Sequence, residues 1–304
     1  MTISGRRALR QALLGLTPLV VIGVVLLVLL SLRLGPARAV IASATASTTA
    51  LVTATGLDDG RGIDVTFTAA DGSDRTGRLT LDSPQDVPLD VRILIAYDPT
   101  DPATVYAEGD AATATVDDLV NGLIVVVLVV LVAVAVTVVR VVRRRRLETA
   151  PTVTVSVRRE RYRRGLTDRT WLVADTGRGP AWFPVYWDHA VESIGEDPTS
   201  VLAHGSPTAD ALVAFEVGTT MLWPSGRRRD SPPKGTQREL PPQTPRVTLL
   251  RQVRADGVMV FLAPLMGLLW AYVDGSGPAG FVFATFLSAG VLFWLPSVQG
   301  SDPT

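Results

Sequence analysis

Residues 119–146 read LVNGLIVVVLVVLVAVAVTVVRVVRRRR, and this stretch decides the fold. Before its four closing arginines, Arg140 is the only charged residue, and only Asn121 and Thr137 have polar side chains. A helix over residues 119–142 would be about 36 Å long, which exceeds the ~30 Å hydrocarbon core of a bilayer. The four arginines act as a stop, because moving charged side chains into lipid is costly. We therefore expect a transmembrane helix over residues 119–142, with soluble chain on either side.

The composition favours a membrane protein with several spans. The chain has 304 residues, of which 47% are hydrophobic, and its mean hydropathy is +0.30. Basic and acidic side chains balance at 29 each, but residues 33–118 carry 6 basic and 14 acidic ones, whereas residues 143–256 carry 19 and 13. Because positive charge collects on the cytoplasmic face, we expect the second region inside the cell and the first outside. Neither total indicates a nucleic-acid binder.

Rare residue types exclude several kinds of chemistry. The chain has no cysteine, which rules out disulfides, thiolate catalysis and cysteine-built zinc or iron–sulfur sites. With only His189 and His204, a multi-histidine metal centre is not expected. The apolar runs contain no Asp, Glu, His or Lys, although ion and proton pathways place such groups at membrane depth. We therefore rank a transporter or pump low, and we predict no cofactor and no metal.

A short basic segment, residues 1–11, precedes an apolar run over residues 12–32. A signal peptide would use Ala37-Arg38-Ala39 as its cleavage site, but the apolar region of a signal peptide has only about 7–15 residues. The longer run here favours a retained transmembrane helix. In either case, residues 33–118 are expected outside the cytoplasm.

Residues 33–118 are predicted to contain a small β domain. Asp71-Gly72 is a hairpin turn signal, and the prolines and aspartates of residues 98–102 are expected to close a strand and cap a turn. A calcium site built from Asp98, Asp101 and Asp110 with Glu108 is the alternative, but the spacing fits no D-x-D-x-D-G loop, so turn capping is favoured. The segments rich in β-branched residues that alternate with a period of two are 50–55, 62–68, 77–81 and 91–97.

Two motifs in this region resemble a known family. They are Phe67-Thr68-Ala69-Ala70-Asp71-Gly72 and Val91…Tyr97-Asp98-Pro99…Asp101-Pro102, set between two apolar runs. With them, residues 40–110 resemble the bacterial membrane family called domain of unknown function 3592, which has a V-x-F-x-x-x-D-G hairpin and a V-x-V-x-Y-D-P-x-x-P closing strand. In one departure, Asp90 stands where the family has a glycine. The resemblance implies a shared fold but no mechanism, because the family has no established activity.

Residues 143–256 are predicted to form a second, basic β domain. A Pro- and Arg-rich loop over residues 224–245 is expected to be mobile. Four of the six tryptophans (Trp171, Trp182, Trp187 and Trp223) supply enough aromatic area for a core. The strand-like segments are 152–157, 170–174, 181–187, 211–217 and 220–223.

Two arginine-rich runs in this domain predict a membrane-surface role. The first run, Arg143–Arg146, stops the transmembrane helix. The second, Arg158–Arg164, follows about 12 residues later on a domain tethered to the inner leaflet. There, each arginine is expected to contribute ~1 kcal/mol of binding free energy towards anionic lipid. Nucleic acid is disfavoured, because Tyr162 is the only aromatic residue within the second run. We predict anionic lipid headgroups as partners of Arg143, Arg144, Arg145, Arg146, Arg158, Arg159, Arg161, Arg163 and Arg164.

The chain ends in two further apolar runs, residues 257–273 and 279–296, followed by a cytoplasmic tail over 297–304. We expect two transmembrane helices joined by a tight turn, with a shallow re-entrant hairpin as the alternative because the first run is short. Trp270 and Trp294 are placed for an interfacial belt. A helix-packing face is predicted at Gly280, Ala284 and Ser288, towards either another protein or the neighbouring span.

The sequence thus predicts a multi-span α-helical membrane protein with two small mainly-β soluble domains. No residue is assigned to catalysis, to a cofactor or to a metal. The expected function is that of a non-enzymatic scaffold or accessory protein that binds unknown protein partners on both sides of the bacterial inner membrane. One alternative is an envelope sensor that signals through the helix at 119–142. Another is a membrane-bound hydrolase that uses the cytoplasmic domain, with His189 beside Asp188 and Glu192 as its base.

Overall fold

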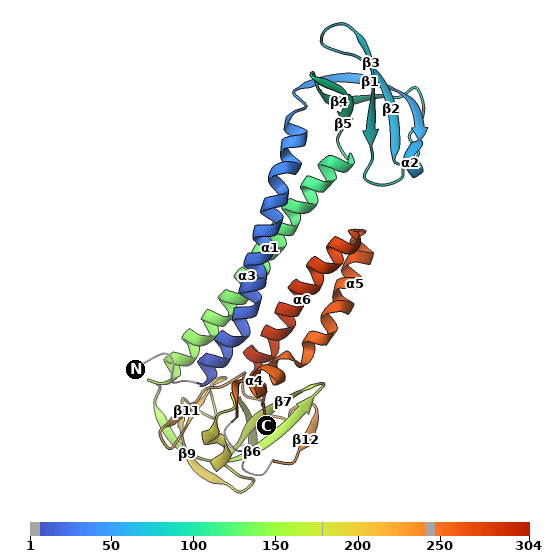
Figure 1. Ribbon diagram of the computed structural model, residues 1–304. Helices are drawn as coiled ribbons and strands as arrows, with labels where there is room; N and C mark the ends of the chain where they lie inside the picture. The colour runs from blue at the N-terminus through green and yellow to red at the C-terminus, as the bar shows by residue number, and fades with distance from the viewer. Residues whose placement is uncertain (1–6, 178, 241–246) are drawn as a thin grey trace. The chain divides into compact units, whose positions relative to one another are not determined.

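Figure 1 shows the computed structural model, which describes residues 7–177, 179–240 and 247–304. Four of its helices are long and apolar enough to cross a membrane, and two regions are rich in β-strands. The chain forms two compact units, one of Val25–Leu128 and one of Met1–Val24 with Val129–Thr304. Parts of three predicted segments lie outside the described residues, namely 1–6, Arg178 and 241–246.

The first two long helices exceed their predicted bounds. Helix α1 spans Arg7–Ala42 and α3 spans Ala111–Leu147, so residues 33–42 and 111–118 are helical and not part of the β domain. Helix α3 begins early because Asp110 caps it. The Asp110 carboxylate accepts hydrogen bonds from the backbone N–H of Thr113 at 2.6 Å and of Ala107 at 3.1 Å. An apolar run in the sequence locates the part of a helix that can lie in lipid, but it does not show where the helix begins and ends.

Five strands in the first unit close into a barrel with the order β1-β2-β3-β5-β4. The hairpin predicted at Asp71-Gly72 joins β2 to β3 and is confirmed, whereas β5 was not predicted because it starts inside the Asp/Pro turn. Asp98 caps that turn by accepting hydrogen bonds from Thr100, which lower the pKa of its carboxyl. The strands are β1 Ala46–Gly56, β2 Gly62–Thr68, β3 Asp74–Thr80, β4 Arg92–Asp98 and β5 Asp101–Tyr106.

The barrel interior is filled by alternate residues of its strands, as a period-two pattern requires. Ile63, Val65 and Phe67 point inwards from β2, and the Phe67 ring lies 4.8 Å from that of Tyr97 on β4. Before β4, Asp90 has φ +63, a left-handed conformation that glycine adopts without strain. Asp90, which stands where the resembled family has a glycine, therefore has a backbone conformation that favours glycine.

The second unit contains a seven-stranded antiparallel sheet that we call the sheet domain. Its order is β11-β10-β9-β6-β7-β8, with β12 also paired to β6. The four tryptophans predicted to form its core are all buried, but they lie in three clusters. Trp187 lies in the main core, Trp171 and Trp182 pack together, and Trp223 packs against Leu9 of α1. The strands are β6 Thr152–Arg164, β7 Thr167–Asp175, β8 Pro180–Val185, β9 Thr199–His204, β10 Ala214–Val217, β11 Thr220–Leu222 and β12 Thr236–Arg238.

The described part of the Pro/Arg-rich loop, residues 224–240, is attached to this sheet. The backbone of Arg229 exchanges hydrogen bonds with that of Trp182, and Ser225 N donates to Pro184 O at 2.8 Å. Strand β12 lies within the loop and pairs with β6. The loop covers the edge strand β8, which carries two prolines and so has fewer backbone donors for a neighbouring strand. These contacts argue against the predicted mobility of residues 224–240.

The C-terminal region is a helical hairpin, as predicted. Helix α4 (Leu249–Asp256) continues through a 3-10 helix, η3 (Gly257–Leu262), into α5 (Ala263–Asp274), and α6 (Gly277–Gln299) packs back against α5. Figure 1 shows α5 and α6 side by side. Gly275 and Gly277 both have positive φ, which the tight turn between the helices requires.

Trp294 is not part of an exposed aromatic belt. Its side chain is only 8% exposed, and its Nε1 donates a hydrogen bond of 3.0 Å to Thr137 Oγ1 on α3. Thr137 is one of the two polar side chains in the apolar run, so it serves as the acceptor for a buried indole. Trp270, by contrast, is exposed. A tryptophan near the end of a span therefore needs structural evidence before it is assigned to the lipid interface.

Candidate functional site

Residues 300–304 are folded into the second unit, between the sheet domain and the helices. Gly300 has φ +75, and a Cβ there would lie 2.6 Å from the Ser225 Cβ, so glycine alone fits this turn after α6. The chain then runs beside β7, where the Asp302 backbone N–H donates to the carbonyl oxygen of Asp168 at 2.8 Å. This segment brings two buried clusters of polar side chains together.

The first cluster surrounds the Asp302 carboxylate. Its Oδ2 accepts a hydrogen bond from Thr170 and lies 3.7 Å from Arg159 Nη2 and 3.8 Å from Arg161 Nε. Arg161 is shared with Asp168 at 2.9 Å. Burial lowers the pKa of the Arg159 guanidinium, and the charge of Asp302 opposes that shift. Both side chains of the Arg159–Asp302 pair are almost fully buried, so removing either leaves an uncompensated charge.

The second cluster surrounds Asp256, which is 1% exposed at the end of α4. Its Oδ1 accepts hydrogen bonds from Gln11 Nε2 at 3.1 Å, from Gln252 Nε2 at 3.2 Å and from the Ser301 hydroxyl. These donors come from α1, from α4 and from the segment after α6. A buried carboxylate needs such donors, because water no longer solvates it. The cluster therefore ties three parts of the chain to one carboxylate.

The C-terminal end of α6 is capped by side chains of other elements. The Val298 carbonyl oxygen accepts hydrogen bonds of 2.7 Å from Arg140 Nη1 on α3 and from the Tyr186 hydroxyl. The carbonyl oxygen of Gln299 accepts one of 2.7 Å from Arg169 Nη2 on β7. Cationic donors suit this position, because the last carbonyls of a helix lack partners and carry partial negative charge. We call this capped end, with the Asp302 and Asp256 clusters, the polar junction.

The junction corrects the predicted basic surface for three of its nine arginines. Arg144 is buried, and its Nε donates to the carbonyl oxygen of Pro224, while Arg159 and Arg161 turn towards Asp302. For Arg159 and Arg161 the reason is that β6 is one continuous strand, in which residues two apart point to the same face. Arg163 is half-buried, and the exposed members of the set are Arg143, Arg145, Arg146, Arg158 and Arg164.

Helix packing also differs from the predicted face. Of Gly280, Ala284 and Ser288, only Ala284 is buried. Three other glycines lie so close to a neighbouring helix that an added Cβ would not fit. A Cβ on Gly290 of α6 would lie 3.1 Å from the Leu19 Cα of α1. The same holds for Gly267 of α5 against Thr285 of α6, and for Gly15 of α1 against Ser297 of α6. The partners found are thus helices of this same chain.

The geometry around His189 gives little support to a hydrolase. His189 Nδ1 lies 3.7 Å from Glu192 Oε2, and its ring packs edge-on against Trp187. Asp188 instead caps the 3-10 helix η2 (His189–Ser193), because its carboxylate accepts from the Ala190 N–H at 3.1 Å. The hydroxyl of that helix, on Ser193, donates to a backbone carbonyl. No hydroxyl is positioned as a nucleophile against this histidine among these contacts.

Other titratable residues have structural roles. His204 Nε2 lies 3.0 Å from Glu216 Oε2 across β9 and β10. Asp98 caps a turn and Asp110 caps a helix, so both aspartates act as caps, the role that was favoured over calcium binding. Across the described residues, no three His, Cys, Asp or Glu side chains gather where they could hold a metal ion.

Sequence reasoning missed the polar junction, although weak signals were present. Gln252 and Asp256 lie four residues apart on one face of an amphipathic helix, and Gln11 is a polar residue just before an apolar run. Nothing local shows that these residues meet. Comparison with protein families, with curated proteins and with solved structures finds no match. The resemblance to the family called domain of unknown function 3592 stays a prediction.

Proposed function

We propose that this chain is a multi-pass protein of the bacterial inner membrane that acts as a non-enzymatic scaffold or accessory protein. Its four long apolar helices support the membrane placement. The exposed arginines that follow the apolar part of α3, Arg143, Arg145 and Arg146, support an orientation with the sheet domain in the cytoplasm. In this orientation, both ends of the chain are cytoplasmic and the acidic barrel lies outside.

Helix α1 is proposed to be retained and not cleaved as a signal peptide. Gln11 donates to Asp256 and Ser301, and Leu19 packs against the backbone of α6 at Gly290. Removal of α1 would leave the Asp256 carboxylate without one of its donors and would open the contact surface of α6. These contacts support α1 as a structural helix of the mature protein.

The polar junction is the observation that carries the proposal. Its hydrogen bonds join the sheet domain to α3, to α6 and to the segment after α6, and that segment is joined through Asp256 to α1 and α4. These contacts support the domain as a platform. A platform of this kind suits the presentation of a binding surface. The exposed arginines of the sheet domain are proposed to contact anionic lipid headgroups, which would hold the platform close to the bilayer.

Site-specific photo-crosslinking in cells tests the proposal. We expect a crosslinker at Leu94, which points outwards from β4 and is 71% exposed, to capture a distinct extracytoplasmic protein. The matched control is Thr76, an exposed polar position on β3. On the sheet domain, the corresponding pair is Leu202 and Ser200 of β9. Absence of any captured partner, together with a hydrolase activity that His189→Ala abolishes, would show that the scaffold proposal is wrong.

A sensor is the second candidate, because one uninterrupted helix, α3, lies between the barrel and the sheet domain along the chain. Its first turn is held by the buried carboxylate of Asp110, so a change in the barrel would act directly on the helix start. Hydrogen exchange on an Asp110→Ala variant separates the two candidates. A sensor predicts altered exchange in residues 148–164, whereas a rigid scaffold predicts a change confined to the barrel and the first turns of α3.

A further inference from the structure

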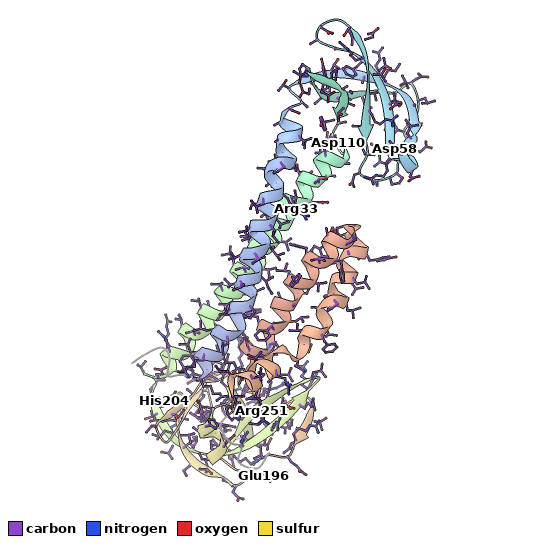
Figure 2. All side chains as sticks on the ribbon, viewed as in Figure 1. Arg33, Asp58, Asp110, Glu196, His204 and Arg251 are labelled. Carbon is purple, nitrogen blue, oxygen red and sulfur yellow. The ribbon has the colours of Figure 1, made fainter. Side chains whose placement is uncertain are left out.

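A cleft of about 480 Å³ opens beside α4, where the helix meets the β6–β7 turn and the segment after α6. We call it the α4 cleft. Its volume falls within the ~300–1,000 Å³ range of small-ligand sites. Figure 2 labels Arg251, one of its lining residues, where α4 approaches the sheet domain. The lining residues used below are Leu166, Asp168, Leu250, Arg251, Arg254 and Asp302.

The charges in the cleft leave an excess of positive charge. Its two side-chain carboxylates are already paired, because Asp168 binds Arg161 at 2.9 Å and Asp302 lies beside Arg159 and accepts from Thr170. The Thr304 oxygen that lines the cleft also has a partner, because it accepts from Arg161. Arg251 and Arg254 are exposed, and neither side chain forms an ion pair within residues 7–177, 179–240 and 247–304. Three residues apart, they lie on neighbouring positions of one helix face. The cleft therefore suits an anion.

Apolar side chains surround the same cleft. Leu250, which lines it, is 74% exposed, and Leu166 on the opposite wall is also exposed. Leu249 and Val253 add exposed apolar surface on α4, which is the first part of the helical segment Leu249–Asp274 that is long and apolar enough to cross a membrane. Paired arginines beside exposed leucines match a molecule that has an anionic group and a hydrocarbon chain. A free phosphate ion has no hydrocarbon part, so it would not make apolar contacts with these leucines.

We propose that the α4 cleft binds one anionic phospholipid, with Arg251 and Arg254 contacting its phosphate and Leu250 contacting its acyl chain. This inference rests on the membrane placement proposed above, and it names a specific lipid site on the cytoplasmic face. It differs from the attraction of lipid by the exposed arginines of α3 and β6, because a defined cleft predicts saturable binding by one headgroup.

The test uses the full chain in a neutral detergent, so it does not depend on orientation in a membrane. Dioctanoyl phosphatidylglycerol is titrated and binding is measured by thermophoresis, with dioctanoyl phosphatidylcholine and inorganic phosphate as comparisons. We expect saturable binding of phosphatidylglycerol, and about twenty-five-fold weaker binding for the double variant Arg251→Gln/Arg254→Gln, at about fivefold for each arginine. The matched control, Arg38→Gln/Arg92→Gln, changes two exposed arginines that lie outside both the cleft and the predicted basic surface, and it should bind within about twofold of the original chain.

Leu250→Gln provides a second variant that keeps both arginines. It should weaken binding of phosphatidylglycerol several-fold and leave any binding of inorganic phosphate unchanged. Non-saturable lipid binding, or an equal loss in the Arg38/Arg92 control, would overturn the proposal. Inorganic phosphate that binds as tightly as phosphatidylglycerol would also overturn it and would indicate a free-anion site. None of these results would contradict the proposal that the barrel and the sheet domain lie on opposite sides of the membrane. Accessibility labelling tests that proposal separately.

Discussion

The close crossing of α1 and α6 predicts opposite effects for two glycine substitutions. At Gly290, an added Cβ would lie 2.9 Å from Leu19 Cδ1 and 3.1 Å from Leu19 Cα, both shorter than the ~3.5–4.0 Å of a normal carbon–carbon contact. The Leu19 backbone cannot rotate away as a side chain can, so the two helices must separate. At Gly35 of α1, an added Cβ would meet nothing within 4 Å.

The expected magnitudes follow from two competing terms. Alanine is favoured over glycine in a helix by about 1 kcal/mol, which both substitutions gain. Overpacking in a filled interior typically costs about 1–3 kcal/mol, which only Gly290→Ala incurs. We therefore expect Gly290→Ala to lower the free energy of unfolding by about 1 kcal/mol. Gly35→Ala should raise it by up to about 1 kcal/mol.

Reversible unfolding of the full chain in mixed detergent micelles measures both variants. The pair controls for effects of the glycine-to-alanine change itself, because both positions are helical. If Gly290→Ala stabilises the protein as much as Gly35→Ala does, then α1 and α6 do not cross at this distance. The retention of α1 as a structural helix would then lose its main packing support.

Further substitutions test three other parts of the structure by the same unfolding measurement. Asp90→Gly should stabilise the chain by about 0.5–1 kcal/mol because it relieves a left-handed φ, whereas Asp90→Val should destabilise it. Thr137→Val and Trp294→Phe should show a coupling of about 0.5–1.5 kcal/mol in a double-mutant cycle, and purely additive effects would argue against their hydrogen bond. Asp302→Asn should cost about 3–5 kcal/mol because it leaves Arg159 buried and unpaired. Adding Arg159→Met should recover much of that loss, and a loss that persists would contradict the pairing.

The helices and most strands could be predicted from the sequence because their signals are local. A long apolar run indicates a possible span, and the alternation of Ile63, Val65 and Phe67 indicates a half-buried strand. The Asp71-Gly72 hairpin was found for the same reason. Helix ends were missed, because Ala- and Thr-rich segments such as 111–118 have no apolar signal, and only the cap at Asp110 fixes the start of α3.

The polar junction could not be predicted, because its partners are far apart in the chain. Gln11 meets Ser301 across 290 residues, and Thr170 meets Asp302 across 132. The arginines of β6 illustrate the same limit. Their clustering indicated a basic surface, but continuation of the strand turns Arg159 and Arg161 towards the interior. Whether an arginine is exposed depends on tertiary contacts that a charge run does not show.

Cysteine accessibility tests the central claim, that the barrel and the sheet domain lie on opposite sides of a membrane. The chain has no cysteine, so Thr76→Cys on the barrel and Ser231→Cys on the sheet domain each provide one thiol at an exposed position. A membrane-impermeant maleimide is added to intact spheroplasts and, separately, to permeabilised ones. We predict that Thr76→Cys is labelled in intact spheroplasts and that Ser231→Cys is labelled only after permeabilisation. Labelling of both variants in intact spheroplasts, or of neither, would contradict the claim.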